Sequence, residues 1–189
     1  ERVQQLSLTE TTAIALGALD KDGDLDIVTA SKGGGSRVWL NEADADNQPF
    51  QDSGLRLDAD AVTESVILDD ADRDGDLDIV LGHFGEKNAI WFNHPKDPLD
   101  PTPFPRTFGT YFDDPTVEGD ARWIGEPVMN AGRTFGLAKG DLDGDGDDDY
   151  VEAIFGDQTR IWIREDDGES RFHDVQTLEG SVGDRRSLA

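Results

Sequence analysis

The sequence has 189 residues, and its 42 acidic residues against 17 basic ones give a formal net charge of −25. This charge argues against nucleic acid as a partner, because phosphate binding depends on clustered lysine and arginine, and no apolar run approaches the roughly 20 residues of a membrane-spanning helix. The absence of cysteine excludes disulfides and thiolate metal sites.

The predicted elements begin with a unit of short strands around an acidic loop. Strands are predicted at residues 13–16, 27–28 and 37–40, because short β-branched and aromatic runs bounded by glycine and aspartate are typical of strands. The loop at residues 18–26 separates the first two strands. A weaker fourth strand is predicted near residues 54–57, which makes the unit an antiparallel meander.

The second unit repeats this order and is followed by a proline-rich segment. Its strands are predicted at residues 65–68, 79–80 and 89–92, and its acidic loop at residues 70–78. Five prolines fall between residues 95 and 105. Because proline removes a backbone donor and fixes φ, a central strand is disfavoured there. We therefore expect an extended surface insertion over residues 95–133.

The third unit has predicted strands at residues 134–137, 150–151 and 160–163, an acidic loop at residues 141–149 and a weak strand near residues 172–175. In every unit a tryptophan follows an aspartate of the loop by 19 residues: Asp20 and Trp39, Asp72 and Trp91, Asp143 and Trp162. Repeats of this length predict a modular array in which each unit completes its neighbour's core. We expect one all-β domain over residues 1–189, with units at 11–58, 62–94 and 134–178.

Each acidic loop offers the ligands that a calcium ion prefers. Ca²⁺ takes six to eight oxygen atoms, and a D-x-D-x-D-G run supplies carboxylates at alternate positions around a glycine turn. Without an ion, such closely spaced carboxylates would repel one another. Three bound ions would reduce the net charge from −25 to about −19. The sequence therefore predicts a calcium site in each loop.

The expected ligands differ in number between the loops. They are carboxylates, except for the backbone carbonyls of Asp24, Asp76 and Asp147: Asp20, Asp22, Asp24 and Asp26 in the first loop; Asp70, Asp72, Asp74, Asp76 and Asp78 in the second; Asp141, Asp143, Asp145, Asp147 and Asp149 in the third. Ala18 stands where the other loops begin with aspartate. We expect two strong sites and a weaker one in the first loop.

An EF-hand or dockerin-like module is an alternative for the third loop. Residues 141–152 satisfy the EF-hand formula, with Glu152 at position 12. The corresponding residues in the other units are Thr29 and Leu81, which cannot supply a carboxylate. Both flanks of the loop have strand patterns. We therefore expect the shared repeat structure, with Glu152 as an outward strand residue.

The three units resemble the FG-GAP or VCBS repeat family. The residues that carry this resemblance are the loops, the runs at 25–28 and 77–80, and the endings Trp39-Leu40-Asn41 and Trp91-Phe92-Asn93. The third unit departs from it by ending in Arg164. The resemblance implies blades of a β-propeller with calcium loops between the first two strands, in proteins that are secreted, periplasmic or displayed on a cell surface.

Three units are fewer than the four to eight blades of closed propellers. The chain is therefore expected to contain a degenerate fourth blade in the insertion, to be part of a longer protein, or to form an open arc that another subunit completes. We favour assembly with another chain, identical or different, because the ends of an arc would leave unpaired edges.

The leading functional hypothesis is a non-catalytic, calcium-stabilised binding or assembly module outside the cytoplasm. Part of a polysaccharide- or lipid-processing enzyme is an alternative, but His83, His94 and His173 are scattered and no nucleophile is paired with a base. Carbohydrate is a possible ligand, with Trp123, Tyr111 or Phe112 stacking on a sugar ring.

Overall fold

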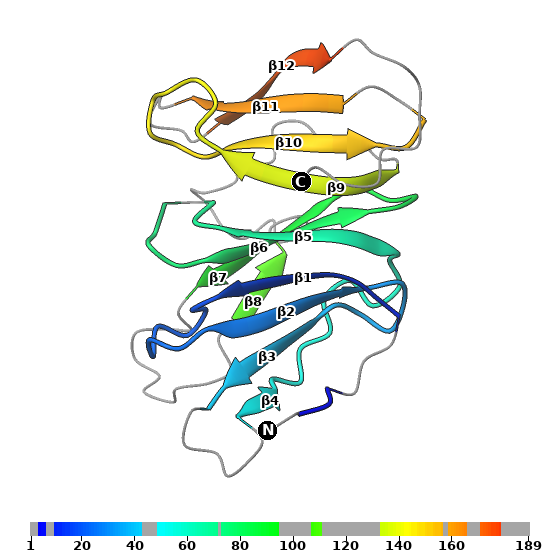
Figure 1. The fold of residues 1–189 in the computed structure, drawn as a ribbon, viewed down its shortest axis with the longest axis vertical. Helices are drawn as coiled ribbons and strands as arrows, with labels where there is room; N and C mark the ends of the chain where they lie inside the picture. Colours follow the sequence, from blue (N-terminus) through cyan, green and yellow to red (C-terminus); the bar gives the residue numbers. More distant parts are fainter. Residues whose placement is uncertain are drawn as a thin grey trace.

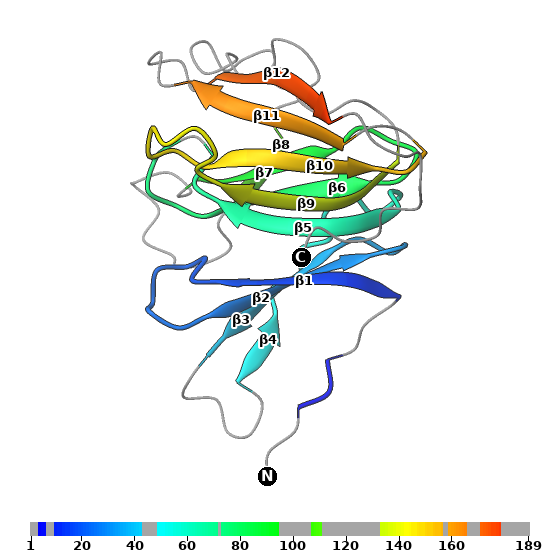
Figure 2. The same cartoon turned by 45° about the horizontal axis from the view of Figure 1, so that its top comes forward.

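The computed structural model describes residues 4–6, 10–42, 49–71, 73–94, 107–110, 133–156, 159–165 and 171–178. These residues form three four-stranded antiparallel sheets that are stacked along the long axis of the molecule (Figures 1 and 2). The all-β fold class predicted from the sequence is confirmed. Within the described segments, no helix has the length and apolar character needed to cross a membrane.

Every sheet is an up-and-down meander in which neighbours in sequence are neighbours in space. The first sheet contains β1 (Thr11–Gly17), β2 (Asp26–Ser31), β3 (Arg37–Asn41) and β4 (Phe50–Asp52). The second contains β5 (Thr63–Asp69), β6 (Asp78–His83), β7 (Ala89–His94) and β8 (Thr107–Thr110). The third contains β9 (Thr134–Gly140), β10 (Asp149–Ile154), β11 (Thr159–Glu165) and β12 (Arg171–Leu178).

Two edge strands differ from the sequence expectation. The fourth strand of the first sheet is Phe50–Asp52, not residues 54–57, where Leu57 instead makes an isolated bridge to Ser36. The fourth strand of the second sheet, β8, lies inside the segment that was expected to be an insertion, and it pairs with β7. As an edge strand that follows the prolines, β8 obeys the rule that keeps proline out of central strands. The aromatic residues Trp123, Tyr111 and Phe112 lie outside the described residues.

The first strands of the three sheets pack beside one another, β1 against β5 and β5 against β9. The middle sheet therefore presents one side to the first sheet and the other side to the third. We call these its front face and its back face, and we use the same two names for the corresponding sides of the first and third sheets. Side chains alternate between the two faces along each strand. In the middle sheet both faces are covered, which explains why β6 is buried throughout its length.

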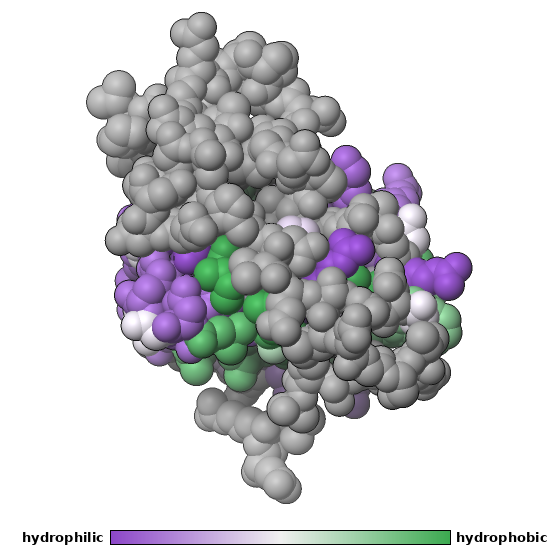
Figure 3. Space-filling view, turned by 90° about the horizontal axis from the view of Figure 1, so that it is seen from above, coloured by the Kyte–Doolittle hydropathy of each residue, from purple (hydrophilic) through white to green (hydrophobic). Residues whose placement is uncertain are grey.

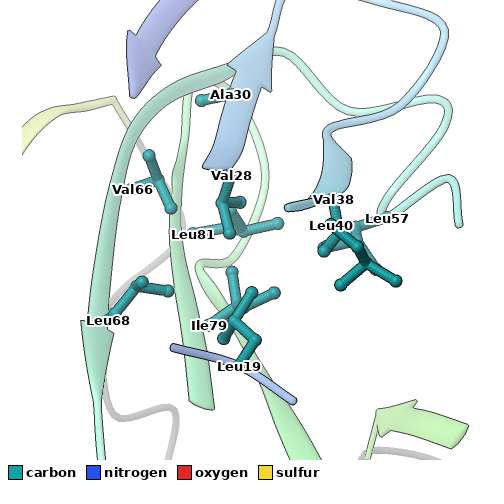
Figure 4. Packing of buried hydrophobic residues seen from close by; sticks show 10 residues of the cluster. All are labelled: Leu19, Val28, Ala30, Val38, Leu40, Leu57, Val66, Leu68, Ile79 and Leu81. Carbon is teal, nitrogen blue, oxygen red and sulfur yellow. The ribbon is translucent and has the colours of Figure 1, made fainter. Parts of the chain in front are cut away.

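The first interior layer joins the back face of the first sheet to the front face of the second (Figure 4). The back face contributes Val28, Ala30, Val38 and Leu40, and the front face contributes Val66, Leu68, Ile79 and Leu81. The second layer repeats this arrangement one sheet further on, where Ile67, Val80, Ile90 and Phe92 meet Leu137, Tyr150 and Trp162. Burial of apolar surface between successive sheets therefore holds the stack together.

Candidate metal-binding loops

The three acidic loops join the first two strands of their sheets, β1 to β2, β5 to β6 and β9 to β10. All three project from the same side of the stack (Figure 1). This is the position that the repeat pattern predicts. Because the first strands pack side by side, the loops of successive sheets are also neighbours.

The last aspartate of each loop anchors it to the sheet. Both carboxylate oxygens of the buried Asp26 accept backbone N–H groups, from Leu19 at 2.7 Å and from Asn41 at 2.9 Å. The Asp78 carboxylate accepts the backbone N–H groups of Ala71 and Asn93 in the same way. The Asp149 carboxylate accepts those of Leu142 and Arg164. One side chain thus ties the start of the loop to the third strand, and each oxygen retains a lone pair for a cation.

Aspartates within the loops accept hydrogen bonds from backbone groups two residues further on. In the third loop the N–H of Asp145 donates to Asp143 at 3.1 Å, and the N–H of Asp147 donates to Asp145 at 2.9 Å. The first loop has the same turns between Asp20, Asp22 and Asp24. Such Asx turns curl the backbone around its own carboxylates.

The third loop brings three carboxylates together. Oxygen atoms of Asp141, Asp143 and Asp149 lie within 4.8 Å of one another, which makes this the one acidic cluster of metal-binding size among the described residues. The N–H of Asp145 lowers the pKa of Asp143, but desolvation and the charges of Asp145 and Asp149 raise it more, so the pKa lies above its usual value. An all-oxygen donor set of this charge suits a hard cation such as Ca²⁺.

The second loop shows an oxygen that lacks a partner. Asp70 Oδ2 accepts the N–H of Gly75 at 3.0 Å, while the buried Asp70 Oδ1 has no hydrogen-bond partner within the described part of the chain. A buried anionic oxygen without a partner is costly, and a bound cation would remove that cost. Asp72, one of the expected ligands, lies outside the described residues.

The first loop has Ala18 where Asp70 and Asp141 stand in the others. Burial raises the pKa of Asp20, and the nearby charges of Asp26 and Asp22 raise it further, against a hydrogen bond from the N–H of Asp22. The carboxylates of this loop therefore also repel one another. With one carboxylate fewer, the loop holds less charge with which to attract a cation.

Ion pairs connect the loops of successive sheets. Lys21 of the first loop contacts Asp76 of the second, and Arg73 of the second contacts Asp147 of the third. These aspartates are the residues whose carbonyls, not carboxylates, are expected to bind the ion. Their side chains instead join one loop to the next.

The EF-hand alternative for the third loop is excluded, because strands β9 and β10 flank the loop. The expectation that Glu152 points outward is wrong. Glu152 is fully buried and accepts hydrogen bonds from Thr134 at 2.6 Å, Asn88 at 2.9 Å and Trp162 at 3.2 Å. Its equivalents Thr29 and Leu81 are also buried, and the apolar Leu81 was the signal in the sequence for an interior position.

A second buried group, centred on Asp69, is not apparent from the sequence. The Asp69 carboxylate accepts hydrogen bonds from the ammonium group of Lys139 at 2.7 Å and from the hydroxyl group of Tyr150 at 2.6 Å. It also forms an ion pair with the guanidinium group of Arg164. Burial raises the pKa of Asp69, but these three partners lower it below its usual value. Arg164 is the residue at which the third unit departs from the repeat pattern, and it crosses to the second sheet to meet Asp69.

Successive four-stranded meanders, each with an acidic loop between its first two strands, define an all-β protein made of β-propeller-type blades. Residues 19–81 match the family model for the FG-GAP-like repeat, which supports the similarity to FG-GAP-like repeats. The match runs from the first loop into β6. The third sheet has the same strand order and the same loop position. A comparison with curated proteins finds no match.

Proposed function

We propose that this protein is a non-catalytic, calcium-stabilised module for binding or assembly that works outside the cytoplasm. The observation that carries the proposal is the convergence of Asp141, Asp143 and Asp149 within 4.8 Å. The unpartnered buried oxygen of Asp70 gives independent support in the second loop. Both arrangements concentrate negative charge, and a bound dication would offset the resulting repulsion.

In this proposal the ions are structural. A dication in each loop would fix the turn between the first two strands, and the interloop ion pairs would extend that order from one blade to the next. Secreted, periplasmic and cell-surface locations share millimolar-range calcium, which matches the weaker class of protein calcium sites. Ligands would then bind to loops held in fixed positions.

Calcium titration followed by thermal unfolding tests this function. Calcium that binds the folded state alone should raise the melting temperature progressively with concentration, and chelation should reverse the increase. Magnesium is the matched control, because it demands a smaller octahedral site and retains its waters. An unchanged melting temperature under calcium and chelator would contradict the proposal.

The Ala18→Asp variant tests the same function by increasing the calcium affinity of the first loop. The substitution restores the carboxylate found at Asp70 and Asp141, so the weakest site should bind calcium more tightly while the others keep their affinity. Isothermal titration calorimetry would show the change in one site. Equal affinities for all three loops in the unmodified protein would refute the assigned order of sites.

A further inference from the structure

The acidic loops contain peptide bonds that join an aspartate to a glycine. Within the described residues these pairs are Asp22-Gly23, Asp74-Gly75, Asp143-Gly144 and Asp145-Gly146. All of them are exposed to water, and strongly hydrophilic surface gathers at the left of Figure 3, the side from which the loops project in Figure 1. Because glycine has no side chain to shield its nitrogen, such a pair is open to attack by that nitrogen on the carboxyl group of the aspartate.

The turns in the loops hold the two reacting groups close together. In the first loop the N–H of Asp24 donates to Asp22 Oδ1 at 2.9 Å. The ring that this hydrogen bond closes contains both Cγ of Asp22 and the backbone nitrogen of Gly23, so the side chain stays folded over that peptide bond. The hydrogen bond also draws electron density from the carboxyl group, which makes Cγ a better electrophile. Asp74 and Asp145 make the same turn, at 2.8 Å and 2.9 Å.

In the second and third loops, the first aspartate of the loop holds the N–H of the glycine. Asp70 Oδ2 accepts the N–H of Gly75 at 3.0 Å, and Asp141 Oδ2 accepts that of Gly146 at 3.2 Å. Asp141 Oδ1 also accepts the N–H of Gly144, at 2.6 Å. Three of the four glycine N–H groups are therefore bound to an anionic oxygen.

The first loop lacks this hydrogen bond. Ala18 stands where the other loops have the holding aspartate, and within the described part of the chain the N–H of Gly23 has no hydrogen-bond acceptor. Space does not distinguish the loops, because a Cβ built on Gly23, Gly75 or Gly146 meets no atom of the described residues within 4 Å. These three glycines also share a positive φ, of 101°, 87° and 99°. The missing carboxylate is what sets Gly23 apart.

An acceptor on the glycine N–H opposes the attack in two ways. It fixes the orientation of the peptide group, and the hydrogen bond must be broken before the nitrogen can approach Cγ. The negative charge of the acceptor also disfavours loss of the amide proton, because the amide anion that attacks would lie beside another anion. Neither constraint acts on Gly23.

We propose that Asp22 is a modification site, at which the chain isomerises spontaneously to isoaspartate when the first loop holds no cation. The nitrogen of Gly23 gives up its proton and bonds to Cγ of Asp22, and a carboxyl oxygen leaves as water, which yields a cyclic succinimide. Water then adds to the former backbone carbonyl carbon of Asp22. The bond from this carbon to the Gly23 nitrogen breaks, and the main chain now runs through Cβ and Cγ. One water is released and one is consumed, so no other reactant is needed.

Calcium should protect the first loop from this reaction. A coordinated carboxylate stays ionised, and so Asp22 as a ligand could not lose an oxygen atom as water. The isomerised loop would in turn lack the alternating carboxylates on which its calcium site depends, so the modification would inactivate that site permanently. The calcium dependence rests on the proposed function, whereas the preference for Asp22 over the other pairs rests on the hydrogen bonds alone.

Prolonged incubation with chelator, below the melting temperature of the calcium-free protein, tests the proposal. Proteolysis and peptide mapping then locate isoaspartate, which has the mass of aspartate but elutes separately, and the succinimide, which is lighter by one water. We expect isoaspartate at Asp22 ahead of Asp74, Asp143 and Asp145, and slower conversion with calcium. No conversion at Asp22, or equal conversion at all four positions, would overturn the proposal.

Two reciprocal variants, both studied without calcium, test the role of the holding carboxylate. Ala18→Asp supplies the missing acceptor and should slow conversion at Asp22 by about tenfold, the factor that corresponds to about 1.4 kcal/mol. Asp70→Ala removes the acceptor from the second loop and should raise conversion at Asp74 to the rate seen at Asp22. Asp145 is the internal control, because neither substitution alters its loop. Unchanged rates in both variants would contradict the assigned role.

Incubation in guanidinium chloride separates the effect of the fold from that of the local sequence. Unfolding removes the hydrogen bonds, so the four pairs should convert at similar rates. A preference for Asp22 as strong as in the folded protein would assign the selectivity to the neighbouring residues, and the proposal would be wrong. If Asp22 converts first in the folded protein but calcium has no effect, the modification site stands and the first loop is not a calcium site.

Discussion

At the scale of single residues, two buried carboxylates outside the loops, those of Asp69 and Glu152, lie where one blade meets the next. Glu152 of the third sheet accepts a hydrogen bond from Asn88 of the loop between β6 and β7 in the second sheet. Asp69 of the second sheet forms an ion pair with Arg164 of the third. These partners are far apart in sequence, and nothing in the acidic pattern separates them from the exposed carboxylates of the loops. The loop aspartates could be predicted because their spacing repeats. Asp69 and Glu152 could not, since neither has a carboxylate equivalent in the other units.

Glu152 should make stability depend on pH. Burial raises its pKa above the usual 4.5, although hydrogen bonds from Thr134, Asn88 and Trp162 lower it. The folded protein therefore holds this proton more tightly than the unfolded chain does. The resulting stabilisation is complete below about pH 4.5 and is lost as the pH rises through the folded pKa, at about 1.4 kcal/mol per unit of difference.

Comparison with Glu152→Gln isolates this effect. The variant cannot titrate at position 152, so its free energy of unfolding relative to the unmodified protein should rise with pH above 4.5 and then level off. Urea denaturation at a series of pH values, with saturating calcium, measures the difference. Parallel pH profiles for the two proteins would show that Glu152 has the same pKa in both states.

Arg164→Asn should cost roughly 3 kcal/mol, because it leaves a buried carboxylate with fewer charged partners. Adding Asp69→Gly to this variant recreates the glycine and asparagine found at Gly17 and Asn93, and it should recover part of the loss. Denaturant unfolding of both single variants and the double variant gives the coupling energy. Additive losses would mean that Asp69 and Arg164 contribute independently.

At the scale of elements, the first three strands of each sheet could be predicted from the sequence, whereas the fourth strand was placed correctly only in the third sheet. The second strands combine β-branched residues with an acidic loop on one side and a glycine turn on the other, and β2, β6 and β10 occur where the pattern placed them. The edge strands β4 and β8 have three and four residues. Their pairing depends on the neighbouring strand more than on their own composition, and so the sequence pattern misplaced one and missed the other.

Gly17 shows how closely two blades approach each other. A side chain at this position would overlap Leu68 and Leu77, so Gly17→Ala should lower the free energy of unfolding by about 1–3 kcal/mol through overpacking. Gly33→Ala, where the added Cβ meets no atom of the described residues within 4 Å, is the control and should change stability little. Equal losses in both variants, measured by urea denaturation, would mean that backbone freedom dominates over the contact.

At the scale of the whole molecule, the repeats predicted the number of sheets and the shared loop position. They could not predict how equivalent positions differ in burial, because a repeat pattern treats equivalent residues alike. The structure supplies this information through the exposure of Ile14, Leu16 and Leu142, whose equivalents in the second unit are buried. Equivalent residues thus have different environments in different units.

The placement of three acidic loops on one side of a molecule of charge −25 predicts an interaction between salt and calcium. Without calcium, added NaCl should raise the melting temperature by screening repulsion between the loops. With calcium bound, the same addition should have a smaller effect because the charge is already reduced. Differential scanning calorimetry under the four conditions measures both increments. Equal increments would place the dominant repulsion outside the loops.

The meander topology also has a consequence for the way the chain acquires its structure. Every strand pairs with the strand that precedes or follows it in sequence, so sheet formation requires the closure of short loops only, and local contacts of this kind favour rapid folding. During synthesis on the ribosome, the first sheet can form before the third has been translated. Val28 and Val38 would remain exposed to solvent until the second sheet emerges from the ribosome. During this interval the nascent chain is most prone to aggregation.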